Sequence, residues 1–149
     1  HRDLHRKTLF PYTTLFRSAG LTRIASLIVA GGGQGLTATS ARVGVGNGTT
    51  SAAVGDTDLS AASGSGNRQF KVLDATYPSV SGATITLQAT FTSGEANFAW
   101  NEWCIDIGAP TVTSGTTVNA LMVNHKSGAA LGTKASGYVW ALQPVITLS

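Results

Sequence analysis

One segment of the chain, from Ala83 to Thr92, alternates strictly between apolar and polar residues and reads A-T-I-T-L-Q-A-T-F-T. Every second side chain from Ala83 onward is apolar, and the intervening side chains are Thr or Gln. A period of two is typical of a β-strand with one buried and one solvated face. The pattern therefore predicts an antiparallel strand, and we expect its partner to be the segment Arg68 to Thr76, which precedes a turn at Tyr77 to Gly82.

Several other segments have the composition of strands. They are Ala41 to Gly46, Phe98 to Ile107, Val118 to Asn124 and Tyr138 to Leu148. Pro144 within the last of them indicates an edge strand or a bulge, because proline cannot donate a hydrogen bond to a neighbouring strand. Leu21 to Ala30 fits a short helix or a strand equally well. The pattern predicts an all-β fold, an antiparallel β-sandwich or small barrel of about five to seven strands, with at most a short helix near the N-terminus.

Charge is distributed unevenly along the chain. The formal net charge of +3 lies in residues 1–18, which hold four basic side chains against one acidic, whereas residues 19–149 hold six of each. A neutral body lacks the basic surface that binding to phosphate groups requires, so we expect no nucleic-acid partner. No apolar run reaches the roughly 18 residues needed to cross a bilayer, and we expect no membrane partner either.

The first eighteen residues differ from the rest in composition. They are rich in charged and aromatic residues, whereas the chain from Ala19 onward is rich in Gly, Ala, Ser and Thr. The string P-Y-T-T-L-F-R-S resembles translated sequencing-adapter text found at the ends of metagenomic reading frames. We therefore expect residues 1–18 to be a non-native, adapter-derived segment and 19–149 to be a single β-rich domain. The alternative is a natural basic arm that docks on a partner subunit.

Few residues of the body are suited to catalysis. His125 is its only histidine and Cys104 its only cysteine, which is too few for a conventional zinc site. Asp56 and Asp58 are spaced like two ligands of a calcium loop, but the closing Glu of that loop is missing, so we interpret them as turn or helix caps. We therefore expect no metal and no cofactor, and we interpret Cys104 as a buried apolar side chain.

Two arrangements leave other functions open. Glu95 and Glu102 lie seven residues apart across a predicted turn and could form the acid–base pair of a glycosidase. Trp100 and Trp103 should point to opposite sides of their strand, so that one of them could be exposed and stack on a sugar or a neighbouring subunit. The segment Gly33 to Ala38 matches a dinucleotide-binding turn only formally, because no helix is predicted after it.

A longer series of motifs resembles virion proteins of tailed bacteriophages and prophages, such as tail-fibre and collar proteins. It begins with V-G-V-G-N-G-T-T-S-A-A-V-G-D-T-D-L at Val43 and continues with F-T-S-G-E-A-N-F-A-W-N-E-W at Phe91. L-M-V-N-H-K, L-G-T-K-A-S-G-Y-V-W-A-L and a terminal I-T-L-S follow. The sequence departs from the pattern at Cys104 to Asp106 and at His125, where Arg is common. The resemblance implies an oligomeric, non-enzymatic virion component.

The sequence therefore predicts a phage structural protein, a part of the tail, fibre or baseplate or a head decoration, that acts by oligomeric assembly. We expect it in the virion, after assembly in the cytoplasm of the bacterial host, as a homo-oligomer in contact with other virion proteins and with a host-surface glycan as a further candidate partner. The alternatives are a carbohydrate-binding or adhesin module and, less favoured, a glycosidase. The candidate ligand or subunit contacts are Trp100, Trp103, Asn124, His125 and Lys126.

Overall fold

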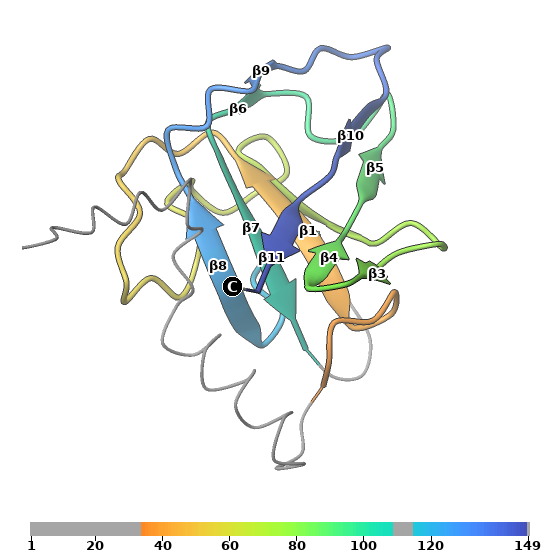
Figure 1. Ribbon diagram of the computed structural model, residues 1–149. Coiled ribbons are helices and arrows are strands. Elements are labelled where there is room, and N and C mark those ends of the chain that lie inside the picture. The colour runs from red at the N-terminus through yellow and green to blue at the C-terminus, as the bar shows by residue number, and fades with distance from the viewer. Residues whose placement is uncertain (1–33, 109–114, 149) are drawn as a thin grey trace, which may run out of the picture.

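The computed structural model describes residues 34–108 and 115–148 (Figure 1). In this part of the chain the fold is all-β, as predicted, with eleven strands in several antiparallel sheets. They are β1 Ala41–Gly46, β2 Arg68–Val72, β3 Ser79–Ser81, β4 Thr84–Thr86, β5 Ala89–Phe91, β6 Ala99–Trp100, β7 Glu102–Ile107, β8 Leu121–Lys126, β9 Gly132–Thr133, β10 Trp140–Leu142 and β11 Val145–Thr147. The segment Leu21 to Ala30, considered as a short helix or a strand, lies outside the described residues.

The largest sheet has four antiparallel strands in the order β2-β1-β7-β8. All six residues of β1 are buried, because β1 lies between β2 and β7 and both of its faces are covered. Val43 and Val45 point to one face of β1, and Arg42, Gly44 and Gly46 point to the other, as the period of a strand requires. The two faces of this sheet differ in character, and the face of Val43 and Val45 carries the larger apolar core.

The apolar face packs against three small sheets, β10-β5, β11-β4-β3 and β6-β9. Figure 1 shows β11 and β4 in front of β7 and β1, with β10 and β5 continuing upwards beside them. The core between these layers contains Val43, Val45, Ile105, Ile107, Leu87, Phe91, Trp100 and Ile146. This layered arrangement agrees with the predicted sandwich-like fold.

The strand count exceeds the predicted five to seven because three predicted strands are each divided in two, the segment 98–107 into β6 and β7, and because the short strands β3 and β9 lie outside the predicted strands. Residues 83–92 form β4 and β5 rather than one strand, and residues 138–148 form β10 and β11. β4 pairs with β11 and β5 pairs with β10, so both breaks occur at the same level of the structure. Pro144 lies at this point, and its carbonyl accepts the N–H of Leu87 at 2.9 Å. The alternation of apolar and polar side chains therefore continues through residues 83–92, whereas the strand pairing is interrupted between β4 and β5.

The predicted partner of this alternating segment was wrong. β2, within Arg68 to Thr76, pairs with β1, whereas β4 pairs with the short strand β3 in a tight hairpin. Gly82 makes the hairpin turn at a φ of 57°, a conformation that glycine adopts without strain. Asp74 still joins the two segments, because its carboxylate accepts from the backbone N–H of Thr90 at 3.1 Å and from the Gln88 side chain at 2.8 Å.

Lys134 holds the loop between β5 and β6 from the inside. Its side chain is 1% exposed. Its ammonium donates to the carbonyls of Thr92 and Glu95 and to Oδ1 of Asn97, each at 2.8 Å. An ammonium has three N–H donors, so these three acceptors satisfy it and fix the loop.

In the described part of the chain, no helix is long and apolar enough to cross a membrane.

Candidate functional site: the charged face of the central sheet

The second face of the central sheet buries charged side chains. Arg42 of β1 lies opposite Asp106 of β7, and Gly46 lies opposite Glu102. The loop between β1 and β2, residues 47–67, covers Glu102 through the backbone of Ser60 and Ala61. Arg42, Asp106 and Glu102 are each at most 1% exposed. Charged groups are rarely buried so completely unless they are paired.

Three glycines make room for this layer. A Cβ atom on Gly44 would lie 2.5 Å from the Phe70 ring, and one on Gly46 would lie 2.6 Å from Oε1 of Glu102. On Gly48 it would lie 2.4 Å from the same oxygen and 2.5 Å from the backbone nitrogen of Ala61. The V-G-V-G-N-G string therefore has a structural cause, because its valines fill the apolar core and its glycines leave space for the ring and the carboxylate.

Gly48→Ala will destabilise the fold by about 1–3 kcal/mol, the usual cost of overpacking a well-packed interior. The added methyl group collides with backbone as well as side-chain atoms, so a change of rotamer cannot relieve it. Gly55→Ala is the matched control, since a Cβ atom there meets nothing within 4 Å. Urea unfolding of the two variants measures the difference, and equal midpoints would contradict the close approach at Gly48.

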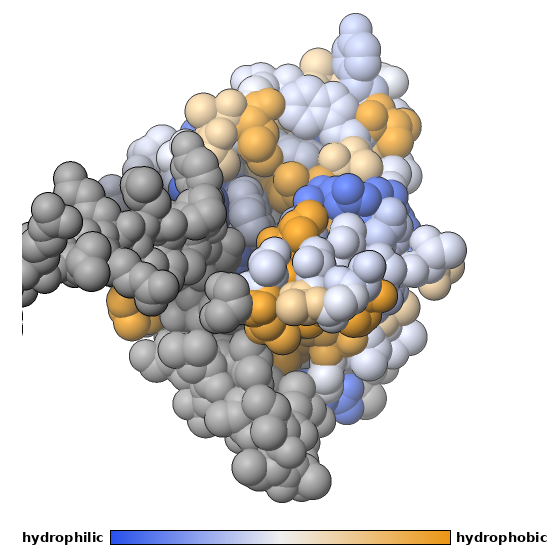
Figure 2. Space-filling model, in the orientation of Figure 1, coloured by the Kyte–Doolittle hydropathy of each residue, from blue (hydrophilic) through white to orange (hydrophobic). Residues whose placement is uncertain are grey.

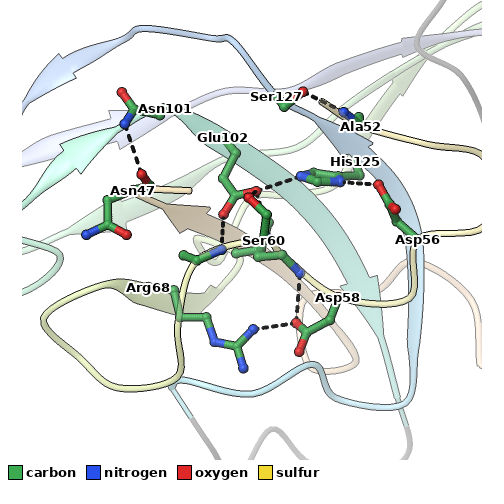
Figure 3. Close-up of polar contacts among 12 residues, drawn as sticks. Asn47, Ala52, Asp56, Asp58, Ser60, Arg68, Asn101, Glu102, His125 and Ser127 are labelled. Atoms are coloured by element: carbon green, nitrogen blue, oxygen red, sulfur yellow. Dashed lines mark hydrogen bonds and ion pairs between the residues drawn. The ribbon is translucent and has the colours of Figure 1, made fainter. Parts of the chain in front are cut away.

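Glu102 and Asp56 clamp the ring of His125 from both sides (Figure 3). Nε2 of His125 lies 2.8 Å from Oε2 of Glu102, and Nδ1 lies 2.7 Å from Oδ2 of Asp56. Glu102 also accepts from the N–H and hydroxyl of Ser60 at 3.0 and 2.9 Å, and from the N–H of Ala61 at 2.7 Å. The clamp joins the covering loop to β7 and β8, three segments that are distant in sequence.

These contacts fix the protonation states of the clamp. Burial by itself would raise the pKa of Glu102, but the hydrogen bonds from His125, Ser60 and Ala61 outweigh it and lower the pKa to about 2. Burial by itself would lower the pKa of His125, but the two carboxylates outweigh it and raise this pKa above its usual value. Glu102 is therefore an ionised hydrogen-bond acceptor at neutral pH and holds no proton to give to a sugar.

A second buried pair lies further along the same face. The guanidinium of Arg42 donates to Asp106 through Nε at 3.0 Å and through Nη2 at 2.5 Å. Nη2 also donates to the carbonyl of Thr117 at 2.6 Å, and the guanidinium carbon lies 4.7 Å from the centre of the Phe70 ring. The N–H of Asn119 donates to Asp106 at 2.6 Å. Burial raises the pKa of Asp106, and Arg42 opposes that rise.

Cys104 lies between the two charged units, and its burial agrees with the sequence interpretation. Burial, together with the negative charges of Asp106 and Glu102, raises the pKa of its thiol well above the usual value. The thiol packs with Leu59, Phe70 and Met122 in a small apolar cluster. A buried thiol that resists ionisation is a poor nucleophile, although Cys104 lies directly opposite His125 in the strand register.

The other candidate side chains from the sequence are mostly tied to the protein itself. Trp100, Asn124 and His125 are buried, Trp103 is half-buried and Lys126 is exposed. Trp100 stacks edge-on against Phe91 and Trp140, with centroid distances of 5.0 and 5.1 Å. The Oδ1 atom of Asn124 accepts the backbone N–H of Ile105 at 2.8 Å. Of the five candidate contacts, Trp103 and Lys126 thus retain exposed surface.

The acidic candidates have structural partners as well. Glu95 binds the ammonium of Lys71 at 2.5 Å and caps the turn at Thr92, and it makes no contact with Glu102. Asp56 closes a turn by accepting the N–H of Ala53 at 2.8 Å, and Asp58 pairs with Arg68 at 2.7 Å. Turn capping by Asp56 agrees with the sequence interpretation. Within the described residues, no group of three or more His, Cys, Asp or Glu side chains is placed to hold a metal ion.

Sequence reasoning missed Arg42, Asp106, Ser60 and Lys134. A signal for the first pair was present, because Arg42 is the only charged residue of the strand predicted at Ala41 to Gly46, and Asp106 lies between two isoleucines near the end of the strand predicted at Phe98 to Ile107. Opposite charges on two predicted strands favour a cross-strand pair. Comparisons of the chain with protein-family models, with curated proteins and with solved structures found no match.

Proposed function

We propose that the protein is a non-enzymatic structural component of a tailed-phage or prophage virion and that it acts by oligomeric assembly. The motif series from Val43 to Ser149 supports the virion assignment. The proposal that the protein is not an enzyme rests on the burial of Glu102, which is 0% exposed. Glu102 is the central residue of the cluster of carboxylate and imidazole groups on the charged face. The carboxylate, imidazole and thiol groups of this face contact the protein itself, so the face serves stability rather than substrate binding.

The sheet β11-β4-β3 supplies the surface for assembly. Its three strands contain only Ser, Thr, Val and Ile, without a charged residue. Val80 of β3 is 70% exposed, and Val145 of β11 is 49% exposed. Figure 2 shows hydrophobic residues exposed over the face on which this sheet lies. Monomeric proteins usually blunt strand edges with charge, so an uncharged edge with exposed valines is suited to pairing with another chain.

The partner that we propose for this sheet is a second copy of the chain, with other virion proteins at further surfaces. Pairing of β3 with an equivalent strand would satisfy the free backbone groups of its edge and cover Val80. The resulting oligomer would be incorporated into the virion in the cytoplasm of the bacterial host.

Light scattering of the full chain over a range of concentrations tests this proposal. We expect a defined oligomer and a shift of Val80→Lys towards the monomer, because a charge on the edge strand opposes strand pairing. Ser63→Lys is the control, since Ser63 is also exposed but lies in a loop outside the sheet. A chain that stays monomeric at the highest concentration would contradict assembly and favour the second candidate function.

That second candidate is a carbohydrate-binding or adhesin module. The half-buried Trp103 and the 65% exposed Tyr138 offer aromatic surface for stacking on a sugar. Glycan-array binding that is lost in Trp103→Ala or Tyr138→Ala, with the fold retained, would establish this function instead.

A further inference from the structure

The contacts of His125 specify how many protons its ring carries. Both ring nitrogens lie within 2.8 Å of a carboxylate oxygen. An ionised carboxylate can only accept hydrogen bonds, and a neutral imidazole has only one N–H to donate. Both contacts therefore require the doubly protonated, positively charged ring. A neutral ring leaves a nitrogen lone pair facing a carboxylate oxygen on one of its two sides.

The two carboxylates differ in how readily they can separate from the His125 ring. Glu102 is fully buried and accepts three further hydrogen bonds from the covering loop, so it stays ionised and fixed on the sheet. Asp56 has a side chain that is 26% exposed, so water can solvate it when it separates from the ring. The Nδ1 contact with Asp56 is therefore the one that a neutral His125 gives up.

We propose that Asp56, His125 and Glu102 form a proton-dependent latch, which holds residues 52–58 of the covering loop on the central sheet while His125 is doubly protonated and releases them when it loses a proton. The rest of the loop stays attached, because Leu59 is buried in the small apolar cluster and Ser60 and Ala61 remain bound to Glu102. At the two ends of residues 52–58, the N–H of Ala52 donates to the Ser127 hydroxyl at 2.7 Å and Asp58 pairs with Arg68. The latch therefore frees the residues between these two contacts, where the side chain of Val54 is 53% exposed.

The surrounding charges favour the protonated ring. From the covering loop, Asp56 contacts the ring directly, and Asp58 lies nearby, paired with Arg68 of β2. From β7, Glu102 contacts the ring, and the uncharged thiol of Cys104 lies opposite His125. Arg42 of β1 is neutralised by Asp106, and Lys126 on the same strand as His125 is exposed to solvent. Among the residues that the structure describes, the negative charge next to the ring therefore exceeds the positive charge.

The latch predicts a definite direction of pH dependence. A histidine whose pKa is raised by folding adds stability that is fully present below about pH 6.5, its unfolded value, and is lost as pH rises through the folded pKa. Glu102 acts on the other side, because its lowered pKa adds stability that is lost as pH falls from about 4.5 towards 2. The latch is therefore closed between these limits and opens as pH rises through the folded pKa of His125.

Two measurements on the full chain test the latch. An NMR titration gives the pKa of His125, whose signal is assigned by its absence in His125→Gln. Hydrogen exchange of residues 52–58, corrected for the intrinsic effect of pH, gives the opening. We expect a His125 pKa above 6.5 and a loss of protection with rising pH of about tenfold for each pKa unit by which the contact with Asp56 raises the pKa of His125.

Matched variants separate a latch from a merely structural histidine. Asp56→Asn should lower the pKa of His125 and flatten the pH dependence of exchange, whereas Asp58→Asn, which leaves both ring contacts in place, should preserve that dependence. Asp56→Asn also carries the test if His125→Gln fails to fold. A His125 pKa at or below 6.5, exchange that does not change with pH, or an Asp56→Asn profile equal to that of the parent chain would overturn the proposal. None of these results depends on whether the chain assembles.

Discussion

Arg42→Met will lower the free energy of unfolding by about 3–5 kcal/mol, the usual cost of removing one partner from a buried ion pair. The substitution retains an unbranched, apolar side chain against Phe70, but it removes both guanidinium hydrogen bonds to Asp106 and the one to the carbonyl of Thr117. Asp106 is 0% exposed, so no solvent replaces these bonds. Urea or guanidinium unfolding followed by tryptophan fluorescence measures the loss.

Two comparisons identify the cause of that loss. Arg42→Met combined with Asp106→Leu should recover part of the stability, because the double variant no longer buries an unpaired carboxylate. Recovery will be incomplete, since the carbonyl of Thr117 lacks its partner in both proteins and the N–H of Asn119 also loses its partner in the double variant. Lys71→Met breaks the partly exposed pair with Glu95 and should cost about 0–1 kcal/mol. Equal losses for Arg42→Met and Lys71→Met would show that the buried pair has no special role.

The sequence predicts the class of the fold well because the strands carry local signals. The alternation of residues 83–92 leads to β4 and β5, and the strand expected at Ala41 to Gly46 has the bounds of β1. Hydrophobic period and turn residues are local properties, readable without knowledge of the partner strand. Breaks in pairing are less local, because the break at Leu87 depends on Pro144, which lies on another segment.

The buried charged face was harder to predict, because its contacts join residues distant in sequence. Asp56 and His125 lie 69 positions apart, and Arg42 and Asp106 lie 64 positions apart. A bulge adds to the difficulty, since the register of β7 and β8 shifts between Ile105 and Asp106. This shift places Met122 and His125 on the same face although they are three residues apart, whereas a regular strand would place them on opposite faces.

Both halves of the V-G-V-G-N-G string now have a physical explanation. The valines serve the apolar core, and the glycines serve a second layer in which Glu102, His125 and Arg42 replace apolar packing. Only 11% of the residues are charged, yet several of them are buried on one face of β1. That face has few apolar side chains, and its charged groups hold the loops to the sheet instead. The apolar core on the opposite face then supplies most of the stability.

Trp100→Ala is expected to have an effect of similar size, a loss of about 3–5 kcal/mol, because Trp100 is the largest fully buried side chain among the described residues. The substitution removes the edge-on contacts with Phe91 and Trp140 and the hydrogen bond from the indole N–H to the carbonyl of Ala96 at 2.9 Å.

Thermal or urea unfolding of Trp100→Ala should be compared with that of Trp103→Ala and Tyr138→Ala. Trp103 is half-buried and should cost less than Trp100, and Tyr138 is exposed and should change stability by no more than about 0.5 kcal/mol. This order follows from burial alone, so it holds for a virion subunit and for a sugar-binding module alike. A Trp100→Ala protein as stable as Tyr138→Ala would place Trp100 outside the core and reopen it as a ligand contact.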